Sequence, residues 1–473
     1  MTAIPDYFCG HLKAENDVFV FSVQDHVVKL LSTKTNENEN IASLIKLADF
    51  EVKKPQYLRG IDEANHEIAF LFQTGSKIVF DQFRSLTFGT PIIIKSCGNA
   101  QGFYQLLTSE WDKFDAISFS GGIINAVYNP KIAALERSTP SEMAEIYRDF
   151  DGARTIEIKP SPDYTRSVSV ALDNQNAEMT VSVSHSGGYG GVNNVSLGSL
   201  GSFIRLEFEH SQTFDKIACY YTVLRKLLAL LVGQNNVSFD VALHQRTKDN
   251  KFIKTANCKI NDGYDDYCEK GFHSVISLDK VFPYIPKLFE IIKSSKNNAN
   301  HILALLPESN KRLGRITFTK VQALCTALEV EYRANGYERP RDARIEELKR
   351  DIGLCVKAFL EKNPDLDVYK KTTISTVYKN LDYSLSDKIF FLYGEHKDVV
   401  DELASDLFVP EITQESIRSF VRLRNTGTHT GIADWGDNGK MYAPLLGLAY
   451  LCLLNRTGMP REEGAKVLRQ LFY

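Results

Sequence analysis

Residues 422–431, RLRNTGTHTG, contain two arginines and one histidine within eight positions of the sequence. The guanidinium groups of Arg422 and Arg424 are permanently charged and are shaped to bind a phosphate or a carboxylate. The imidazole of His429 titrates near neutrality and can therefore give or take a proton. The stretch has the residue types of a site that binds a charged substrate and moves protons on it. It also has the composition of a polar turn between two helices, so the neighbouring elements must decide between the two.

The periodicity before this stretch distinguishes the two arginines. Residues 412–424 are predicted to form a helix in which Ile417 and Phe420 begin an apolar stripe. Arg424 follows Ile417 by seven residues and falls on that stripe, whereas Arg422 falls on a different face. A guanidinium on an apolar face needs a partner, because burying an unpaired charge is costly. A substrate phosphate or a neighbouring subunit would supply one.

The residues between Arg424 and His429 predict the end of this helix. Thr426, Gly427 and Thr428 are poor helix formers, so we expect the helix to end or loosen there. On a continuous helix, positions five apart are separated by about 140° around the axis, and a loosened backbone would let the two side chains converge. The structural alternative is an Arg424 that pairs with a glutamate of the bundle and a His429 that is an ordinary loop histidine.

Other candidates have simpler explanations. Similar Arg-to-His spacings occur at Arg59 and His66 and at Arg205 and His210, the latter inside an alternating strand. The glycine-rich residues 184–202 contain neither of the common phosphate-binding motifs, and we predict a flexible hairpin loop there.

Two further clusters of polar residues are also predicted to have no site function. Glu329, Glu331 and Arg333 are predicted to lie on a solvated helix face. Cys258 and Cys268 are ten residues apart without a zinc-site spacing, and no metal site or cofactor is expected from them.

The chain changes character near residue 310. Residues 1–310 are predicted to be a mostly antiparallel β, sandwich-like unit with a helical appendage and a sub-boundary near residue 212. Residues 311–473 are predicted to be an all-α bundle, which makes the whole chain α+β and multidomain. Its helices are expected at 316–334, 341–362, 367–380, 385–407, 412–424, 440–456 and 461–472.

Composition and cysteine usage favour a globular protein of a reducing compartment. The 473 residues are 43% hydrophobic and 24% charged, with a net charge of −3, which is typical of a globular protein and gives no chain-wide basic field for nucleic acid. The eight cysteines include no CxxC pair, which favours a reducing, cytoplasmic compartment. The first residues have no basic region followed by an apolar one, and the apolar run 442–454 is too short to span a bilayer. We therefore expect no signal peptide and no membrane partner.

The C-terminal part resembles a HEPN domain of the ApeA-like group of antiphage, abortive-infection proteins. Arg424, Asn425 and His429 carry the resemblance, as an arginine, a polar residue and a short gap closed by histidine. The segment ALEVEYRA (327–334) resembles the opening helix of that group, and the β-rich segment before it resembles its usual N-terminal domain. Gly427 and Gly431 depart from a fully helical version of the motif.

The resemblance implies a metal-independent endoribonuclease that needs no cofactor and acts as a homodimer. Arg424, Asn425 and His429 are implied to be its catalytic residues, with RNA as the substrate and transfer RNA among the candidate classes. The 2′-hydroxyl of RNA is itself a nucleophile, so proton transfer by His429 and charge stabilisation by Arg424 are the chemistry required. The N-terminal β-rich region, 1–310, is implied to sense a phage-derived trigger or to hold the nuclease inactive.

Two alternatives remain open at the level of the sequence. The bundle fits a non-catalytic HEPN module that binds nucleic acid or a protein, and the chain also fits a β domain that binds carbohydrate or peptide and carries a helical dimerisation tail. Loss of RNA cleavage on substituting His429 would separate the enzyme from both.

Overall fold

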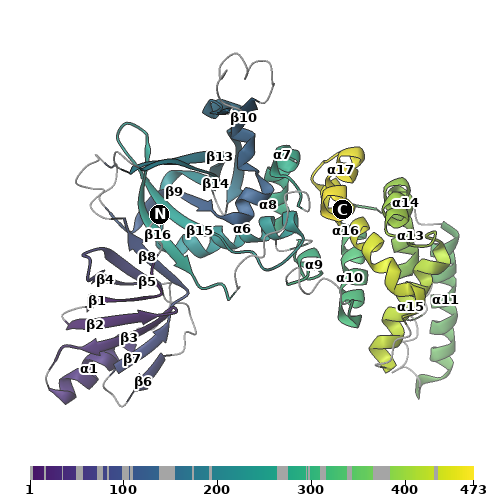
Figure 1. Cartoon of the computed structure of the whole chain (residues 1–473). Helices are drawn as coiled ribbons and strands as arrows, with labels where there is room; N and C mark the ends of the chain where they lie inside the picture. The colour runs from purple at the N-terminus through teal and green to yellow at the C-terminus, as the bar shows by residue number, and fades with distance from the viewer. Residues whose placement is uncertain are drawn as a thin grey trace. The chain divides into compact units, whose positions relative to one another are not determined.

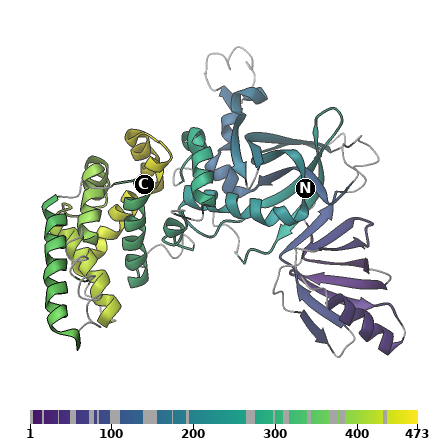
Figure 2. The same ribbon diagram turned by 180° about the vertical axis from the view of Figure 1, so that it is seen from behind.

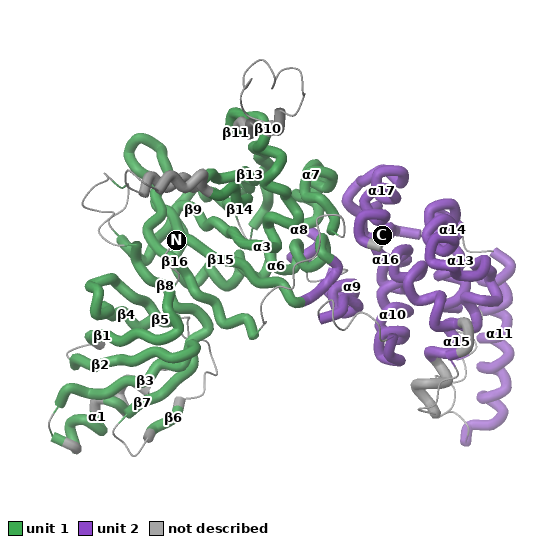
Figure 3. The backbone as a smooth tube through the Cα atoms, in the orientation of Figure 1, with its two compact units in different colours: residues 1–232, 236–289 green, residues 233–235, 290–473 purple. Residues whose placement is uncertain are grey.

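The computed structural model divides the chain into two compact units (Figure 3). Unit 1 comprises residues 1–232 and 236–289, and unit 2 comprises residues 233–235 and 290–473. The residues that the structure describes are 4–14, 17–34, 36–48, 57–71, 78–81, 85–97, 106, 110–137, 155–172, 175–190, 194–263, 275–294, 296, 299–308, 316–337, 343–365, 376, 384–430 and 435–472.

Unit 1 is built on one antiparallel sheet of fourteen strands (Figure 1). Their order is β12-β13-β14-β9-β15-β16-β8-β5-β4-β1-β2-β3-β7-β6. The predicted sandwich would divide these strands between two sheets, but here the hydrogen bonding is continuous. Strand β8 (Ile92–Ser96) is the reason, because it pairs with β5 (Glu67–Leu71) along one edge and with β16 (Phe252–Ile260) along the other.

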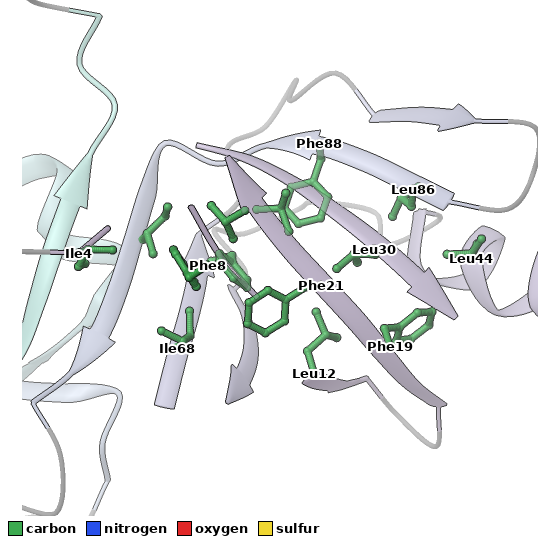
Figure 4. Packing of buried hydrophobic residues seen from close by; sticks show 14 residues of the cluster. Ile4, Phe8, Leu12, Phe19, Phe21, Leu30, Leu44, Ile68, Leu86 and Phe88 are labelled. Carbon is green, nitrogen blue, oxygen red and sulfur yellow. The ribbon is translucent and has the colours of Figure 1, made fainter. Parts of the chain in front are cut away.

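The first strands form a small apolar core of their own. They are β1 (Tyr7–Ala14), β2 (Asp17–Gln24), β3 (Val27–Ser32), β4 (Tyr57–Asp62) and β7 (Ser85–Gly89), with helix α1 (Glu37–Ala48) beside them, and β5 and β8 add residues to the same core. Strand β6 (Ile78–Asp81) pairs with β7 at the edge of the sheet. Figure 4 shows Phe19, Phe21, Leu30 and Phe88 pointing into this core, and each is at most 1% exposed. Alternation of apolar and polar residues along these strands predicts this burial.

The remaining strands carry helices on one face. They are β9 (Lys113–Ser120), β12 (Arg166–Leu172), β13 (Gln175–Gly190), β14 (Asn194–Thr213) and β15 (Asp240–Arg246), with β10 (Ala134–Arg137) and β11 (Thr155–Ile158) as a separate two-stranded sheet. The short helices α3 (Gly122–Val127), α5 (Ser161–Tyr164) and α7 (Leu278–Val281) and the longer α6 (Ile217–Val232) complete the unit, together with the first residues of α8 (Ile285–Lys293), which continues into unit 2 from Glu290 onward. Tyr220 of α6 stacks on Phe208 of β14 at 4.7 Å between ring centroids, so α6 covers this face, as Figures 1 and 2 show from opposite sides.

The glycine-rich residues 184–202 lie in the predicted hairpin, but they are strand for most of their length, so the predicted long loop is wrong. Strand β13 runs to Gly190 and β14 starts at Asn194, and these two residues pair. The register shifts only between Ser186 and Gly188. Regular pairing in the flanking residues extends into the glycines, because glycine and serine weaken a strand without preventing its hydrogen bonds.

Unit 2 is helical over its described residues. Its elements are α9 (Asn300–Leu303), α10 (Phe318–Ala334), α11 (Ala343–Lys362), α13 (Leu385–Glu395), α14 (Lys397–Asp406), α15 (Gln414–Thr430), the 3₁₀ turn η7 (Gly436–Met441), α16 (Tyr442–Arg456) and α17 (Arg461–Phe472). The helix predicted over 385–407 is divided in two at His396. The helix predicted over 367–380 falls, apart from residue 376, outside the described residues.

Helix α16 forms the centre of unit 2 and packs against α10, α14 and α17. Leu445, Leu448 and Cys452 have no exposed surface, as the apolar run predicts. Gly233, which directly follows helix α6, has the positive φ of +64° that favours glycine after the end of a helix. Within the part of the chain that the structure describes, no helix is both long and apolar enough to cross a bilayer.

Candidate active site on helix α15

Helix α15 carries all three residues singled out in the sequence. It is capped at its start by Thr413, whose hydroxyl accepts a hydrogen bond from the backbone N–H of Ser416 at 3.1 Å. The helix then continues through Arg424 to Thr430. The predicted break at residues 426–428 is therefore wrong for the backbone. The preceding turns of the helix extend through these poor helix formers, since propensity differences of under about 1 kcal/mol per residue are readily overridden.

The phase of α15 agrees with the sequence prediction. Ile417 and Phe420 have no exposed surface, and Arg422 is exposed. Arg424 is half-buried. The two arginines of the motif thus differ as predicted, with Arg424 on the side of the helix that packs into unit 2.

The surroundings of Arg424 are provided by helix α10. Burial raises the pKa of the Cys325 thiol to about 12, and the charge of Arg424 acts on this thiol in the opposite direction. The charge of Arg424 also contributes to the lowered pKa of Glu329, one turn further along α10. Both effects place the guanidinium of Arg424 near α10.

Glu329 is the acidic centre of this region. Its carboxylate pairs with Lys388 of α13 at 2.9 Å and with Arg333 at 3.2 Å. Burial alone would raise the pKa of Glu329, but the hydrogen bond from Lys388 and the charges of Lys388, Arg333 and Arg424 together hold it below its ordinary value. Glu329 is therefore a carboxylate paired with two cations, and the charge of Arg424 is the smallest of the effects that lower its pKa.

Asn425 and His429 are placed by the backbone of α15, and their side chains lie outside what the structure describes. Residues four apart on a helix share a face, so these two positions are neighbours on one side. Arg424 and His429 are five apart, which corresponds to about 140° around the axis and about 7.5 Å along it. The backbone therefore groups Asn425 with His429 and places Arg424 on a different side of the same helix.

A second polar cluster in unit 2 corrects the prediction for Glu331. Glu331 was expected on a solvated face, but its side chain has no exposed surface. Its carboxylate contacts His301 at 2.9 Å, Arg456 at 2.8 Å and Asn335 at 3.1 Å. The signal was present in the sequence, because Glu331 follows Leu324 and Leu328 at the spacing that also marked Arg424.

The arginines of the two other Arg-to-His spacings form ion pairs with carboxylates in unit 1. Arg59 pairs with Asp112 at 3.0 Å, and Arg205 pairs with Glu207. Among the residues that the structure describes, no three His, Cys, Asp or Glu side chains come close enough together to hold a metal ion. Cys268, weighed as a metal ligand in the sequence, lies outside those residues.

Comparison with known proteins gives no relative to set beside this geometry: no family model, no curated protein and no solved structure matches the chain.

Proposed function

We propose that the protein is a HEPN-type endoribonuclease of an antiphage, abortive-infection system, with its catalytic residues on helix α15. The observation that carries the proposal is the contrast between Arg424, half-buried on the packed side of α15, and Arg422, exposed two residues earlier. Asn425 and His429 follow Arg424 on the same helix. In this proposal unit 2 is the nuclease, and the β-rich part of the chain senses the trigger.

The proposed reaction uses the nucleophile that RNA itself carries. His429 takes the proton of the 2′-hydroxyl, or returns one to the leaving 5′-oxygen, and Arg424 stabilises the charge that builds up on the phosphate. Asn425 orients one of these groups by hydrogen bonding. The products are a 2′,3′-cyclic phosphate and a 5′-hydroxyl, and the protein supplies no metal ion to the reaction.

The continuous helix makes a single-chain site less suitable than a shared one. Arg424 and His429 lie about 140° apart around α15, so one phosphate cannot easily contact both from one chain. One histidine also cannot act as acid and base in the same step. A symmetric dimer that apposes two α15 helices would supply both histidines and both arginines to one cleft.

The decisive experiment compares wild type with His429→Ala on total transfer RNA in the presence of EDTA. We expect the wild type to cleave and the variant to be inactive, with 2′,3′-cyclic phosphate ends on the products. Cleavage by both proteins, or loss of cleavage on chelation, would refute the mechanism. Binding of RNA by both proteins without cleavage by either would favour the non-catalytic nucleic-acid-binding alternative.

A further inference from the structure

The face of the sheet opposite helix α6 is polar and partly exposed where β14, β9, β15 and β16 lie side by side. On β14, Ile204 and Leu206 are fully buried, whereas Arg205 and Glu207 between and beyond them are half-buried. On β15, His244 and Arg246 are likewise half-buried, whereas Leu243 and Gln245 are buried. Ser118 of β9 and Lys254 of β16 pair with residues of this face and are half-buried too. We call the half-buried residues on this side of the four strands the β14–β16 face. They are Arg205, Glu207, Ser118, His244, Arg246, Phe252 and Lys254.

Two arginines on the β14–β16 face converge on one aromatic ring. The guanidinium groups of Arg205 and Arg246 each lie 5.0 Å from the ring centroid of Phe252. Arg205 stands on β14 and Phe252 on β16, so this contact spans the strands between them. The guanidinium of Arg246 is also held by a hydrogen bond from its Nη2 to the backbone carbonyl oxygen of Phe208 at 3.1 Å, which fixes its position on this face.

Ser118 and His244 add hydrogen-bonding groups to the same face. The hydroxyl of Ser118 and Nε2 of His244 are 2.7 Å apart. His244 pairs directly across the sheet with Lys254, and Arg205 pairs directly with Ser118, so these side chains are immediate neighbours. Burial, together with the charges of Arg205 and Lys254, lowers the pKa of His244 to about 3. His244 is therefore neutral at physiological pH and lies in a positive field.

The positive charge of the face exceeds its negative charge. Glu207 pairs with Arg205, with Nε of the arginine donating at 2.7 Å. Asp115, nearby, accepts from the hydroxyl of Ser211 at 2.5 Å and from the backbone N–H of Arg246 at 2.6 Å. Within the described part of the chain, no carboxylate forms an ion pair with the side chain of Arg246 or Lys254. Among the described residues, Arg246 and Lys254 are thus two cations without an ion-pair partner, and they lie beside a serine hydroxyl and a neutral histidine.

We propose that the β14–β16 face binds the phosphate group of a small ligand, with Arg246 and Lys254 as its charged contacts and Ser118 as a neutral donor. Arginine and lysine are the side chains that most often hold phosphate, and their charge-assisted hydrogen bonds are roughly twice as strong as neutral ones. The ligand chemistry is a phosphate monoester or polyphosphate, free or carried by a nucleotide. The site is independent of the nuclease reaction proposed for unit 2.

The test is calorimetric titration of the full-length protein at low ionic strength with ATP, inorganic phosphate, sulfate and adenosine. We expect ATP or phosphate to bind and adenosine not to bind. ATP tighter than phosphate identifies a nucleotide site, and phosphate at least as tight as ATP identifies a free phosphate site. Sulfate binding as tightly as both, adenosine binding as tightly as ATP, or no binding of ATP and phosphate would overturn the proposal.

Three variants locate the binding. Lys254→Met should weaken it by about tenfold or more, since it removes a charge-assisted contact. Lys251→Met, three residues earlier at an exposed position, is the matched control and should bind like the wild type. Glu207→Gln removes the competing carboxylate and should bind more tightly, a gain that a misfolded protein cannot produce. Equal affinity in all three variants and the wild type would show that the ligand binds elsewhere.

Discussion

Arg456 of α16 pairs at 2.8 Å with Glu331 of α10, a carboxylate with no exposed surface. The pair joins the central helix of unit 2 to the helix that also faces Arg424. Removing one partner leaves a buried charge that water cannot reach. We therefore expect Arg456→Met to lower the free energy of unfolding of unit 2 by about 3 kcal/mol.

Urea unfolding followed by far-UV circular dichroism would measure this loss. The matched control is Arg333→Met, which breaks the pair between Arg333 and Glu329 on the same helix. The side chain of Arg333 is 64% exposed, so the control should cost less than about 1 kcal/mol. Equal losses in the two variants would mean that the Glu331 cluster contributes no more than a surface pair.

The contrast between Glu329 and Glu331 also shows what the sequence can predict. Both lie on α10, whose extent was predicted to within two residues at its start, because helical periodicity is a local property. Their burial differs because α9 and α16 pack over one side of α10. Those contacts join residues far apart in the chain, so the local sequence pattern of α10 does not predict them. The continuous fourteen-stranded sheet could not be predicted for the same reason, since it depends on the pairing of β8 with β16.

His396 provides a prediction for acid stability. Its side chain is 4% exposed, and neither ring nitrogen has a hydrogen-bond partner among the described residues. Burial together with the charge of Arg461 lowers the pKa of His396 to about 4. In the unfolded chain the pKa of this ring is near its ordinary value of about 6.5. Between pH 4 and pH 6.5 the unfolded chain therefore binds a proton that the folded protein does not bind. The stability that a neutral His396 contributes is full above pH 6.5 and is lost as the pH falls towards 4, amounting to about 3 kcal/mol.

The variant His396→Leu removes this titration and should flatten the decline in unfolding free energy from pH 6.5 to 4. Urea unfolding at several pH values, followed by the helical signal at 222 nm, would measure it. His11→Leu, at an exposed strand position, controls for the loss of one histidine and should leave the slope unchanged. A slope that persists in His396→Leu would assign the acid sensitivity to other groups.

Arg424 and Arg422 give a paired prediction for activity. If Arg424 contacts the phosphate, Arg424→Lys keeps the positive charge beside Glu329 but loses the planar fork, and cleavage should fall by about tenfold or more. Arg422→Lys, at the exposed position, should cleave RNA like the wild type. Initial rates on a labelled transfer RNA would measure both. The opposite ranking would show that Arg424 is a structural residue paired with α10.

Gly427 tests whether the helical backbone of α15 is the active form. The sequence suggested that glycine and threonine would loosen the segment between Arg424 and His429, but the backbone there is helical. In a helix, Gly427→Ala removes backbone freedom from the unfolded chain and should stabilise unit 2 by about 0.5–1 kcal/mol. If the dimer uses the helical form, this variant should cleave RNA at the wild-type rate and melt at a higher temperature. If catalysis instead needs the segment to unwind, the same variant should be more stable and less active. Thermal melting and cleavage rates measured on one preparation would distinguish a site formed by two continuous helices from one formed by a local break in each.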